Sequence, residues 1–336
     1  MILELRRIHS VAGIALVALL SSTLPAADAV TISPAIKDAD GLIQHAVVSP
    51  YQPGETDIRV LLPDQLEAGA KLPVVYVLPV EARGRNKFGD GLIEVRKRNL
   101  HNKHRAVYVA PSFQQWPWYG DHPTDAKVRQ ETYFLEVVLP FIEKTYPVSS
   151  QRKDHHLVGF SKSGWGAWSL LLRHPERFGR AAAWDSPMMM PNCDRYGTQD
   201  VFADQETFEK YRLPDAVRSR AANLGKEPRL ILTGYGGFRE HHHQMHDLLD
   251  SLHAPHIYRD GPAFKHDWHS GWIAEALDLL FAETPKTASA STAEVPAYEW
   301  KQVSAKAPFA PRDGAGAVVH RGRMWFLGGW NPGDKE

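Results

Sequence analysis

Ser161 lies in the stretch VGFSKSGWG, whose residue types suit a sharp turn between a strand and a helix. The apolar run HLVGF precedes the serine, and Gly164 and Gly166 open a segment with helical periodicity. Gly159 and Ser163, two residues before and after it, are small enough to let strand and helix approach closely. A helix N-terminus also brings partial positive charge and unbonded amides to the hydroxyl, which favours a developing oxyanion. The pattern predicts a nucleophilic serine for acyl transfer; a glycine-rich turn without chemistry is the alternative.

The segments that must position this serine alternate in character along the chain. Runs rich in β-branched residues predict strands, and amphipathic stretches between the later runs predict helices. Strands that alternate with helices pair in parallel, whereas the shorter connections of the first pair suit an antiparallel edge. The sequence therefore predicts an α/β chain with a mostly parallel central sheet and helices on both faces. The expected strands are 46–49, 58–62, 72–80, 105–111, 156–160, 180–184, 229–233 and 256–260, and the clearest helices are 128–146 and 165–175.

Composition narrows the range of partners. The chain has 336 residues, of which 43% are hydrophobic and 10% aromatic, enough for one sizeable core. Lysine plus arginine total 39 and aspartate plus glutamate also total 39, so no excess of charge favours nucleic acid. We expect a small or neutral substrate and no nucleic-acid partner.

Residues 1–29 have the pattern of a secretory signal peptide. Two arginines precede an apolar run over 11–20, and an Ala-x-Ala sequence closes at Ala29. The apolar run is shorter than the roughly 20 residues that span a bilayer, so we expect no membrane span in the mature chain. Cys193 is the single cysteine, which excludes an internal disulfide. The expected location is periplasmic or secreted.

We assign the predicted α/β domain to 30–283, and the composition of the chain changes after it. A Pro/Ala/Ser/Thr-rich linker follows over 284–296. Residues 297–336 resemble the start of a Kelch propeller blade and predict a short β segment, with strands in PRDGAGAVV and RMWFLGGW. A blade needs roughly 50 residues and a propeller several blades. The segment is therefore either part of a longer protein or a vestigial tail.

The stretch AFKHDWHSGW resembles a motif of the esterase D family, which includes S-formylglutathione hydrolases, feruloyl esterases and mycolyltransferases. The family has Gly-His-x-Trp followed by another Trp; His266, Trp268 and Trp272 match, and Lys265 replaces the glycine. His269 is a second candidate without the matching tryptophan. The stretches WPWYGDHP and LLRHPERFGRAAAWDSP are also similar to family segments. The resemblance covers about 43–281 and implies an α/β-hydrolase fold, a carboxylic ester hydrolase, and His266 as its general base.

The acid of the triad departs from the family pattern. Members carry it in a Gly-x-x-Asp turn, where this chain has Gly236 and Gly237. Asp185 follows the strand after the serine helix and precedes a proline, which resembles the arrangement in certain lipases of the fold. Glu240 resembles the glutamate that mycolyltransferases use. We favour Asp185 and keep Glu240 as the alternative; as ordinary residues they would be a turn aspartate and a first-turn helix carboxylate.

The oxyanion hole departs as well. The family has His-Gly or Asp-Gly after the third strand, where this chain has Pro79 and Val80. Proline has no N–H and cannot donate. We expect the backbone amides of Lys162 and Glu81 to be the donors, and loss of the hole is the alternative.

Aromatic residues suggest where a substrate lies. Trp116, Trp118 and Tyr119 occupy a loop after the fourth predicted strand, where they would line a carbohydrate or aromatic acyl pocket or pack in the core. We assign Trp118, Tyr119 and Trp268 to substrate binding.

Four histidines, His241, His242, His243 and His246, invite a metal interpretation. His242 and His246 are four residues apart on a helix face, but the sequence has no HExxH pattern or third spaced ligand. A solvated helix start is the better interpretation, and we expect neither metal nor cofactor.

These features predict a secreted serine carboxylic ester hydrolase that works through an acyl-enzyme on Ser161, with a small-molecule or carbohydrate-linked ester as substrate. Two alternatives remain open. One is a hydrolase scaffold that has lost catalysis and binds a glycan or peptide, suggested by the altered acid and oxyanion positions. The other is an acyltransferase.

Overall fold

The computed structural model describes residues 29–38, 40–282, 316–320 and 323–327. The chain divides into two units, Met1–Thr284 and Pro285–Glu336, each described by itself. The predicted signal peptide, apart from Ala29, and the predicted linker lie outside the described residues.

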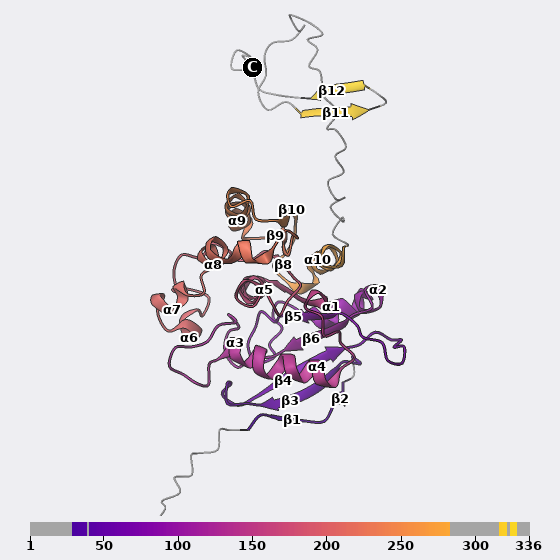
Figure 1. Cartoon of the computed structure of the whole chain (residues 1–336), viewed down its shortest axis with the longest axis vertical. Helices are drawn as coiled ribbons and strands as arrows, with labels where there is room; N and C mark the ends of the chain where they lie inside the picture. The colour runs from indigo at the N-terminus through magenta and orange to yellow at the C-terminus, as the bar shows by residue number, and fades with distance from the viewer. Residues whose placement is uncertain (1–28, 39, 283–315, 321–322, 328–336) are drawn as a thin grey trace, which may run out of the picture. The chain divides into compact units, whose positions relative to one another are not determined.

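Ten strands form one sheet in the first unit (Figure 1). They are β1 (Thr31–Ile32), β2 (Ile36–Lys37), β3 (Ile43–Val48), β4 (Glu55–Leu61), β5 (Val74–Val77), β6 (Val107–Pro111), β7 (His155–Phe160), β8 (Arg180–Trp184), β9 (Leu230–Tyr235) and β10 (His256–Ala263). Their order is β1-β3-β4-β6-β5-β7-β8-β9-β10, with β2 paired to β3. Pairing is antiparallel from β1 and β2 through to β6 and parallel from β6 to β10. The parallel strands share one carboxyl edge, where the residues that follow them meet.

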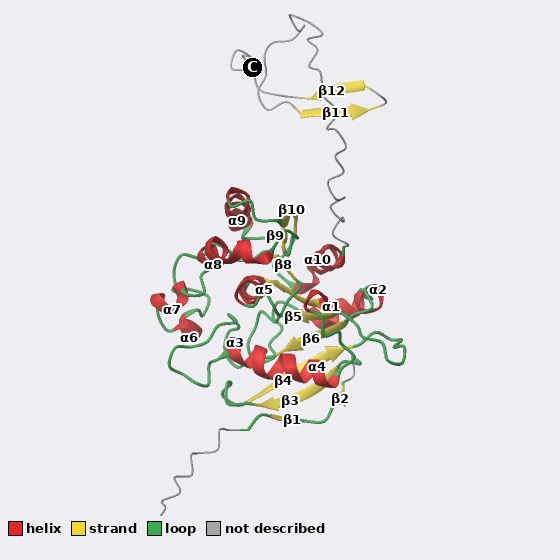
Figure 2. Ribbon diagram, in the orientation of Figure 1, coloured by secondary structure: helices red, strands yellow, loops and turns green. Residues whose placement is uncertain are grey.

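Helices pack on both faces of this sheet (Figure 2). One face carries α3 (Gln130–Tyr133), α4 (Leu139–Thr145), α5 (Lys162–Arg173), α6 (Gln199–Phe202), α7 (Gln205–Glu209), α8 (Leu213–Arg220) and α9 (Arg239–Ser251). The other carries α1 (Gly91–Lys97), α2 (Leu100–Lys103) and α10 (Trp272–Phe281). A π-helical segment, η1 (Phe134–Val138), joins α3 to α4, and the 3-10 segments are η2 (Arg152–Asp154), η3 (Ala221–Leu224) and η4 (Trp268–Ser270).

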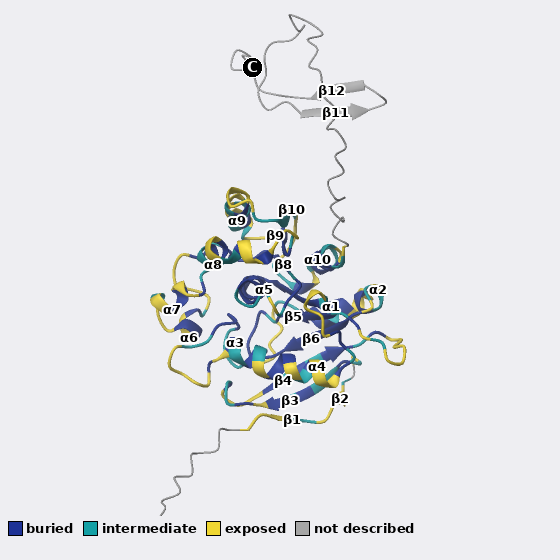
Figure 3. Ribbon diagram, in the orientation of Figure 1, coloured by how far each residue is buried: buried dark blue, intermediate teal, exposed yellow. Residues whose placement is uncertain are grey.

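The core has two parts, one on each side of the sheet. In β5, Val74 and Tyr76 contribute to one part and Val75 and Val77 to the other, because successive side chains of a strand point to opposite faces. A strand buried on both faces is apolar throughout, which explains the continuous run VVYV. Helix α5 is buried along nearly its whole length (Figure 3). The turn at its N-terminus is therefore held from all sides.

The predicted architecture is confirmed. The eight predicted strands correspond to β3 to β10 in chain order, and the first strands are antiparallel. The helix predicted over 128–146 is divided by the π-helical segment η1. The helix predicted from residue 165 begins at Lys162, so Gly164 lies inside it.

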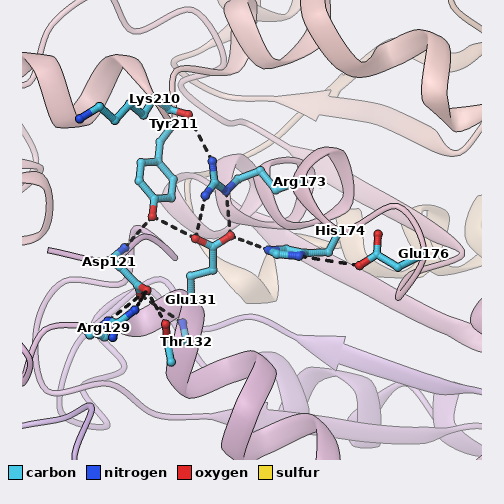
Figure 4. Close-up of polar contacts among 9 residues, drawn as sticks. All are labelled: Asp121, Arg129, Glu131, Thr132, Arg173, His174, Glu176, Lys210 and Tyr211. Atoms are coloured by element: carbon cyan, nitrogen blue, oxygen red, sulfur yellow. Dashed lines mark hydrogen bonds and ion pairs between the residues drawn. The ribbon is translucent and has the colours of Figure 1, made fainter. Parts of the chain in front are cut away.

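Glu131 on α3 anchors the C-terminal end of α5 (Figure 4). Its carboxylate is 5% exposed and accepts hydrogen bonds from Arg173 at 2.7 and 3.1 Å, from His174 Nε2 at 2.6 Å and from the Tyr211 hydroxyl at 3.0 Å. Burial works to raise the pKa of Glu131, but the hydrogen bonds from His174 and Arg173 outweigh it and lower the pKa to about 2. The helix that follows Ser161 is thus tied to α3 at its far end.

Replacing Glu131 by glutamine should lower the free energy of unfolding at pH 7 by about 3 kcal/mol, because the half-buried guanidinium of Arg173 loses its charged partner. Folding lowers the pKa of Glu131 from 4.5 to about 2, so the ionised carboxylate stabilises the folded protein fully at pH values above about 4.5. The difference between wild type and variant should therefore shrink as pH falls from about 4.5 to about 2. Urea unfolding across this range measures it. Glu176→Gln, at an exposed carboxylate 3.9 Å from the same His174, is the control and should change little; an equal loss in both variants would refute the anchor.

The second unit contains one described pair of strands. β11 (Gly316–His320) and β12 (Arg323–Leu327) are antiparallel, with Gly316 opposite Leu327. Most of the segment predicted to be Kelch-like lies outside the described residues, so that resemblance stays a prediction.

Candidate active site

Ser161 occupies a strained turn between β7 and α5. Its backbone has φ 53° and ψ −130°, an unusual conformation for a residue with a side chain. A Cβ on Gly159 would collide with the backbone of Ser163, so only glycine fits two residues before the turn. The Ser163 hydroxyl donates to the Phe160 carbonyl at 2.9 Å and accepts from the Phe160 amide at 3.1 Å. The residue that departs from the usual glycine therefore closes the turn with its side chain.

The Ser161 hydroxyl is left available by these contacts. It does not cap α5 and forms no hydrogen bond to another described residue, His266 included, while the residue stays 7% exposed. Catalytic hydrogen bonds are often long without substrate. The Ser161 backbone is fixed instead: its amide donates to the Trp184 carbonyl at 3.2 Å, and Ser186 Oγ donates to its carbonyl at 2.8 Å.

His266 and Asp185 are directly paired. His266 Nδ1 lies 2.5 Å from Asp185 Oδ2, and the second carboxylate oxygen accepts from the Phe238 amide at 2.9 Å. Asp185 is fully buried, which works to raise its pKa, but the hydrogen bonds from His266 and from the amides of Gly236 and Phe238 outweigh burial and lower the pKa. An ionised Asp185 would accept the Nδ1 proton and leave His266 Nε2 as a base.

Gly236 leaves space for the Asp185 carboxylate. A Cβ at Gly236 would lie 2.5 Å from Asp185 Oδ2, so the carboxylate reaches across from β8 into space next to the turn after β9. The Asp185 amide also donates to the Gly234 carbonyl at 3.0 Å. The turn after β9 therefore has room at Gly236 for a carboxylate that comes from the neighbouring strand β8.

Replacing Gly236 by alanine should therefore displace the Asp185 carboxylate and lower kcat for ester hydrolysis by roughly 10- to 1000-fold, since an imidazole without its partner is badly oriented. Gly237→Ala is a matched control, because nothing lies within 4 Å of a Cβ at that position. Steady-state kinetics on a 4-nitrophenyl ester measures both. Equal activity of the two variants would contradict this packing.

Aromatic rings surround His266. The ring centroids of Phe160, Phe88 and Phe238 lie 4.9, 5.4 and 6.0 Å from that of the imidazole. Phe160 is the residue before Ser161, so the histidine loop and the serine turn meet at the carboxyl edge of the sheet. Nothing in the sequence pattern indicated Phe88 or Phe238, since both belong to irregular loops.

The two competing residues, Glu240 as the acid and His269 as the base, have other partners. Glu240 is exposed on α9 and accepts from Gln244 Nε2 at 2.8 Å, so it is not the carboxylate paired with His266 in this structure. His269 Nδ1 lies 3.0 Å from Glu94 Oε2, so His269 is paired with a different carboxylate. Of the candidates, only His266 and Asp185 are brought together.

The predicted oxyanion donors have no competing acceptor. Within the described part of the chain, neither the Lys162 amide nor the Glu81 amide donates a hydrogen bond. The loop before Glu81 is held by the Tyr119 hydroxyl, which donates to the Pro79 carbonyl at 2.6 Å. The Phe88 amide donates to Glu81 Oε2 at 3.0 Å and turns the loop back on itself. The role of these two amides stays a prediction.

The prediction that Trp118 and Tyr119 bind substrate is wrong, because both side chains are buried. Trp118 and Tyr119 have no exposed surface, and Trp118 packs edge-on against Trp165 at 5.4 Å, so both belong to the core. Both precede α3, and Gln130 fixes their backbone by accepting from the two amides, which turns the rings inward. Trp268 is 3% exposed and forms part of the wall of a cavity of about 210 Å³ beside Val80.

One histidine of the cluster, His242, has a structural role next to the site. His242 Nε2 accepts from the Ser186 amide at 3.0 Å, and burial lowers the pKa of His242 to about 4. His246 Nδ1 lies 2.8 Å from His256 Nε2, with Asp250 close enough for ligand atoms of all three to lie within 4.8 Å. His242 and His246 therefore do not share a ligand site, and no metal is assigned to the chain. Among the described residues, no helix is long and apolar enough to cross a membrane.

Comparison with known proteins identifies the fold. Residues 94–242 match the family model described as "Putative esterase". A ferulic acid esterase is 21% identical, with a TM-score of 0.56 over 71% of this chain and 96% of that chain. An S-formylglutathione hydrolase from Staphylococcus aureus is 15% identical, with a TM-score of 0.58 over 71% and 98%. A fluorophosphonate-binding serine hydrolase from the same organism is 16% identical, with a TM-score of 0.57 over 75% and 100%. A search of curated proteins gave no match.

These similarities establish the predicted α/β-hydrolase fold. The family match supports the predicted resemblance to an esterase family and, with it, an enzyme that hydrolyses carboxylic esters. It does not extend to residues 297–336, where the Kelch-like prediction has no support. A shared fold does not fix the chemistry, which depends on the residues of the site.

Proposed function

We propose that this chain is a serine carboxylic ester hydrolase that works through an acyl-enzyme on Ser161. The observation that carries the proposal is the 2.5 Å pairing of His266 Nδ1 with the buried Asp185, beside a serine in a strained turn. That pairing fixes the imidazole tautomer whose Nε2 can take a proton. A core histidine pair without function would not be accompanied by a strained serine with an unused hydroxyl.

The proposed mechanism has two halves. His266 Nε2 removes the Ser161 proton as Oγ attacks the ester carbonyl, and the amides of Lys162 and Glu81 stabilise the oxyanion. Protonated His266 then gives its proton to the departing alcohol, while Asp185 stabilises the imidazolium. Water, activated by the same histidine, attacks the acyl group and releases the acid and Ser161.

A fluorophosphonate probe tests the proposal directly. It should label Ser161 covalently, with the adduct located by peptide mass spectrometry, and short-chain 4-nitrophenyl esters should be hydrolysed. Methyl ferulate belongs in the substrate panel because one structure of this fold is a ferulic acid esterase. If methyl ferulate is hydrolysed, carbohydrate-linked esters are tested next. Absence of both labelling and turnover would refute the proposal and leave a binding scaffold.

We also propose that the enzyme is exported and that its first 29 residues are removed. The basic, apolar and Ala-x-Ala sequence at the N-terminus supports this. N-terminal sequencing of the exported chain should begin near Val30; an intact Met1 would contradict it.

A further inference from the structure

Lys162, the residue after the serine, is largely buried, and its ammonium group has no hydrogen-bonding partner among the described residues. The residue is 9% exposed, and its Nζ lies 4.5 Å from the centroid of the Trp116 ring. It forms no hydrogen bond and no ion pair with any described residue. Glu81 is the one carboxylate with a resolved effect on it, and Oε2 of Glu81 already accepts from the Phe88 amide.

This placement destabilises the folded chain in two ways. Burial removes water from the ammonium and lowers the pKa of Lys162 to about 8, against the opposing effect of Glu81. The charge stands at the N-terminus of the 12-residue α5, where the helix dipole is also positive. The ammonium nitrogen keeps some accessible surface, and its three N–H donors have no acceptor among the described residues. Such costs are typical of positions kept for function.

The neighbouring loop adds positive charge. In the segment 81–88, Arg83, Arg85 and Lys87 are exposed, whereas Glu81, its single acid, is buried. None of the three cations forms an ion pair with a described residue. A loop of this charge beside the serine attracts anions and repels cations.

We infer that Lys162 Nζ binds a carboxylate carried by the ester substrate, close to the bond that is cleaved. The carboxylate would supply the acceptor that the protein does not, and Trp116 would hold the ammonium toward it from the other side. The inference rests on the proposed ester hydrolysis and adds the substrate class: esters with an acidic group in the acyl or the alcohol part.

Matched ester pairs test this selectivity. For the acyl side, mono-4-nitrophenyl adipate is compared with 4-nitrophenyl hexanoate; for the alcohol side, 4-acetoxybenzoate is compared with phenyl acetate. In wild type, kcat/KM should be roughly tenfold higher for the acidic member of at least one pair, the size expected of one charge-assisted hydrogen bond. Ratios at or below one in both pairs would overturn the inference.

Two lysine variants separate the effect of Lys162 from that of the positive charge of the neighbouring loop. In Lys162→Met the backbone amide is kept and the ammonium lost, so the ratio should fall to about one. Lys87→Met removes an exposed cation of the neighbouring loop, and its ratio should stay close to that of wild type. A preference that survives in Lys162→Met, or that Lys87→Met removes equally, would overturn the assignment to Lys162.

A stability measurement guards against misfolding. Because Lys162 costs stability where it stands, Lys162→Met should have a Tm equal to or above that of wild type; a lower Tm would show that the ammonium is structural and would overturn the inference. Failure of the two proposals is distinguishable. Turnover of neutral and acidic esters at equal rates refutes only the substrate class, whereas absence of all turnover refutes ester hydrolysis itself.

Discussion

Replacing Ser161 by alanine is expected to lower kcat for ester hydrolysis by roughly 10⁴- to 10⁶-fold, because no acyl-enzyme can form without Oγ. Steady-state rates with a short-chain 4-nitrophenyl ester measure the loss, and intact-mass analysis should show no fluorophosphonate adduct. The fold should be retained, since the Ser161 hydroxyl bonds to no described residue and only its backbone supports the turn.

Ser163→Ala is the matched control for this experiment. Its hydroxyl is also buried and two residues away, but it bonds to the Phe160 backbone and not to a reacting group. We expect a loss of stability of about 1 kcal/mol with labelling at Ser161 intact. Wild-type turnover in Ser161→Ala would show that the nucleophile lies elsewhere.

Replacing Asp185 by asparagine should lower kcat by about 10⁴-fold. The carboxamide keeps the shape of the side chain, but it presents an N–H donor to His266 or stabilises the wrong imidazole tautomer. The same substitution in a serine protease triad has an effect of this size. Thermal unfolding of the variant should remain cooperative, which separates loss of activity from loss of fold.

Glu240→Ala is the counterpart for the acid. Glu240 is exposed and interacts with Gln244 on its own helix, so its removal should change kcat less than twofold. An inactive Glu240→Ala together with an active Asp185→Asn would mean that the loop after β9 rearranges on substrate binding and that the structure has assigned the acid wrongly.

The fold was predictable because its signals are local. Apolar runs such as VVYV predict buried strands from composition alone, and alternation with helices leads to a parallel sheet. The turn at Ser161 was predictable for the same reason, since Gly159 and Ser163 meet the steric demands of a strand that passes directly into a helix.

Burial of particular aromatic residues was not predictable. Trp118 and Tyr119 have the composition of a binding loop, yet Gln130 holds their backbone so that both rings enter the core. Amphipathic aromatics suit either environment, and the choice depends on a residue that follows them and on packing across the sheet. Trp116, two positions earlier, is the half-buried ring that contacts Lys162.

The sequence by itself determined the strand order along the chain, the strained serine turn and the histidine candidate, because each depends on residues within a few positions of one another. Only the tertiary structure showed that Asp185, and not Glu240, is paired with His266. Their distances to His266 depend on how β8, β9 and β10 lie side by side, and on the space at Gly236 that lets one carboxylate through. It likewise decided that the Lys162 ammonium has no hydrogen-bonding partner among the described residues, since that depends on every residue that folds around the turn.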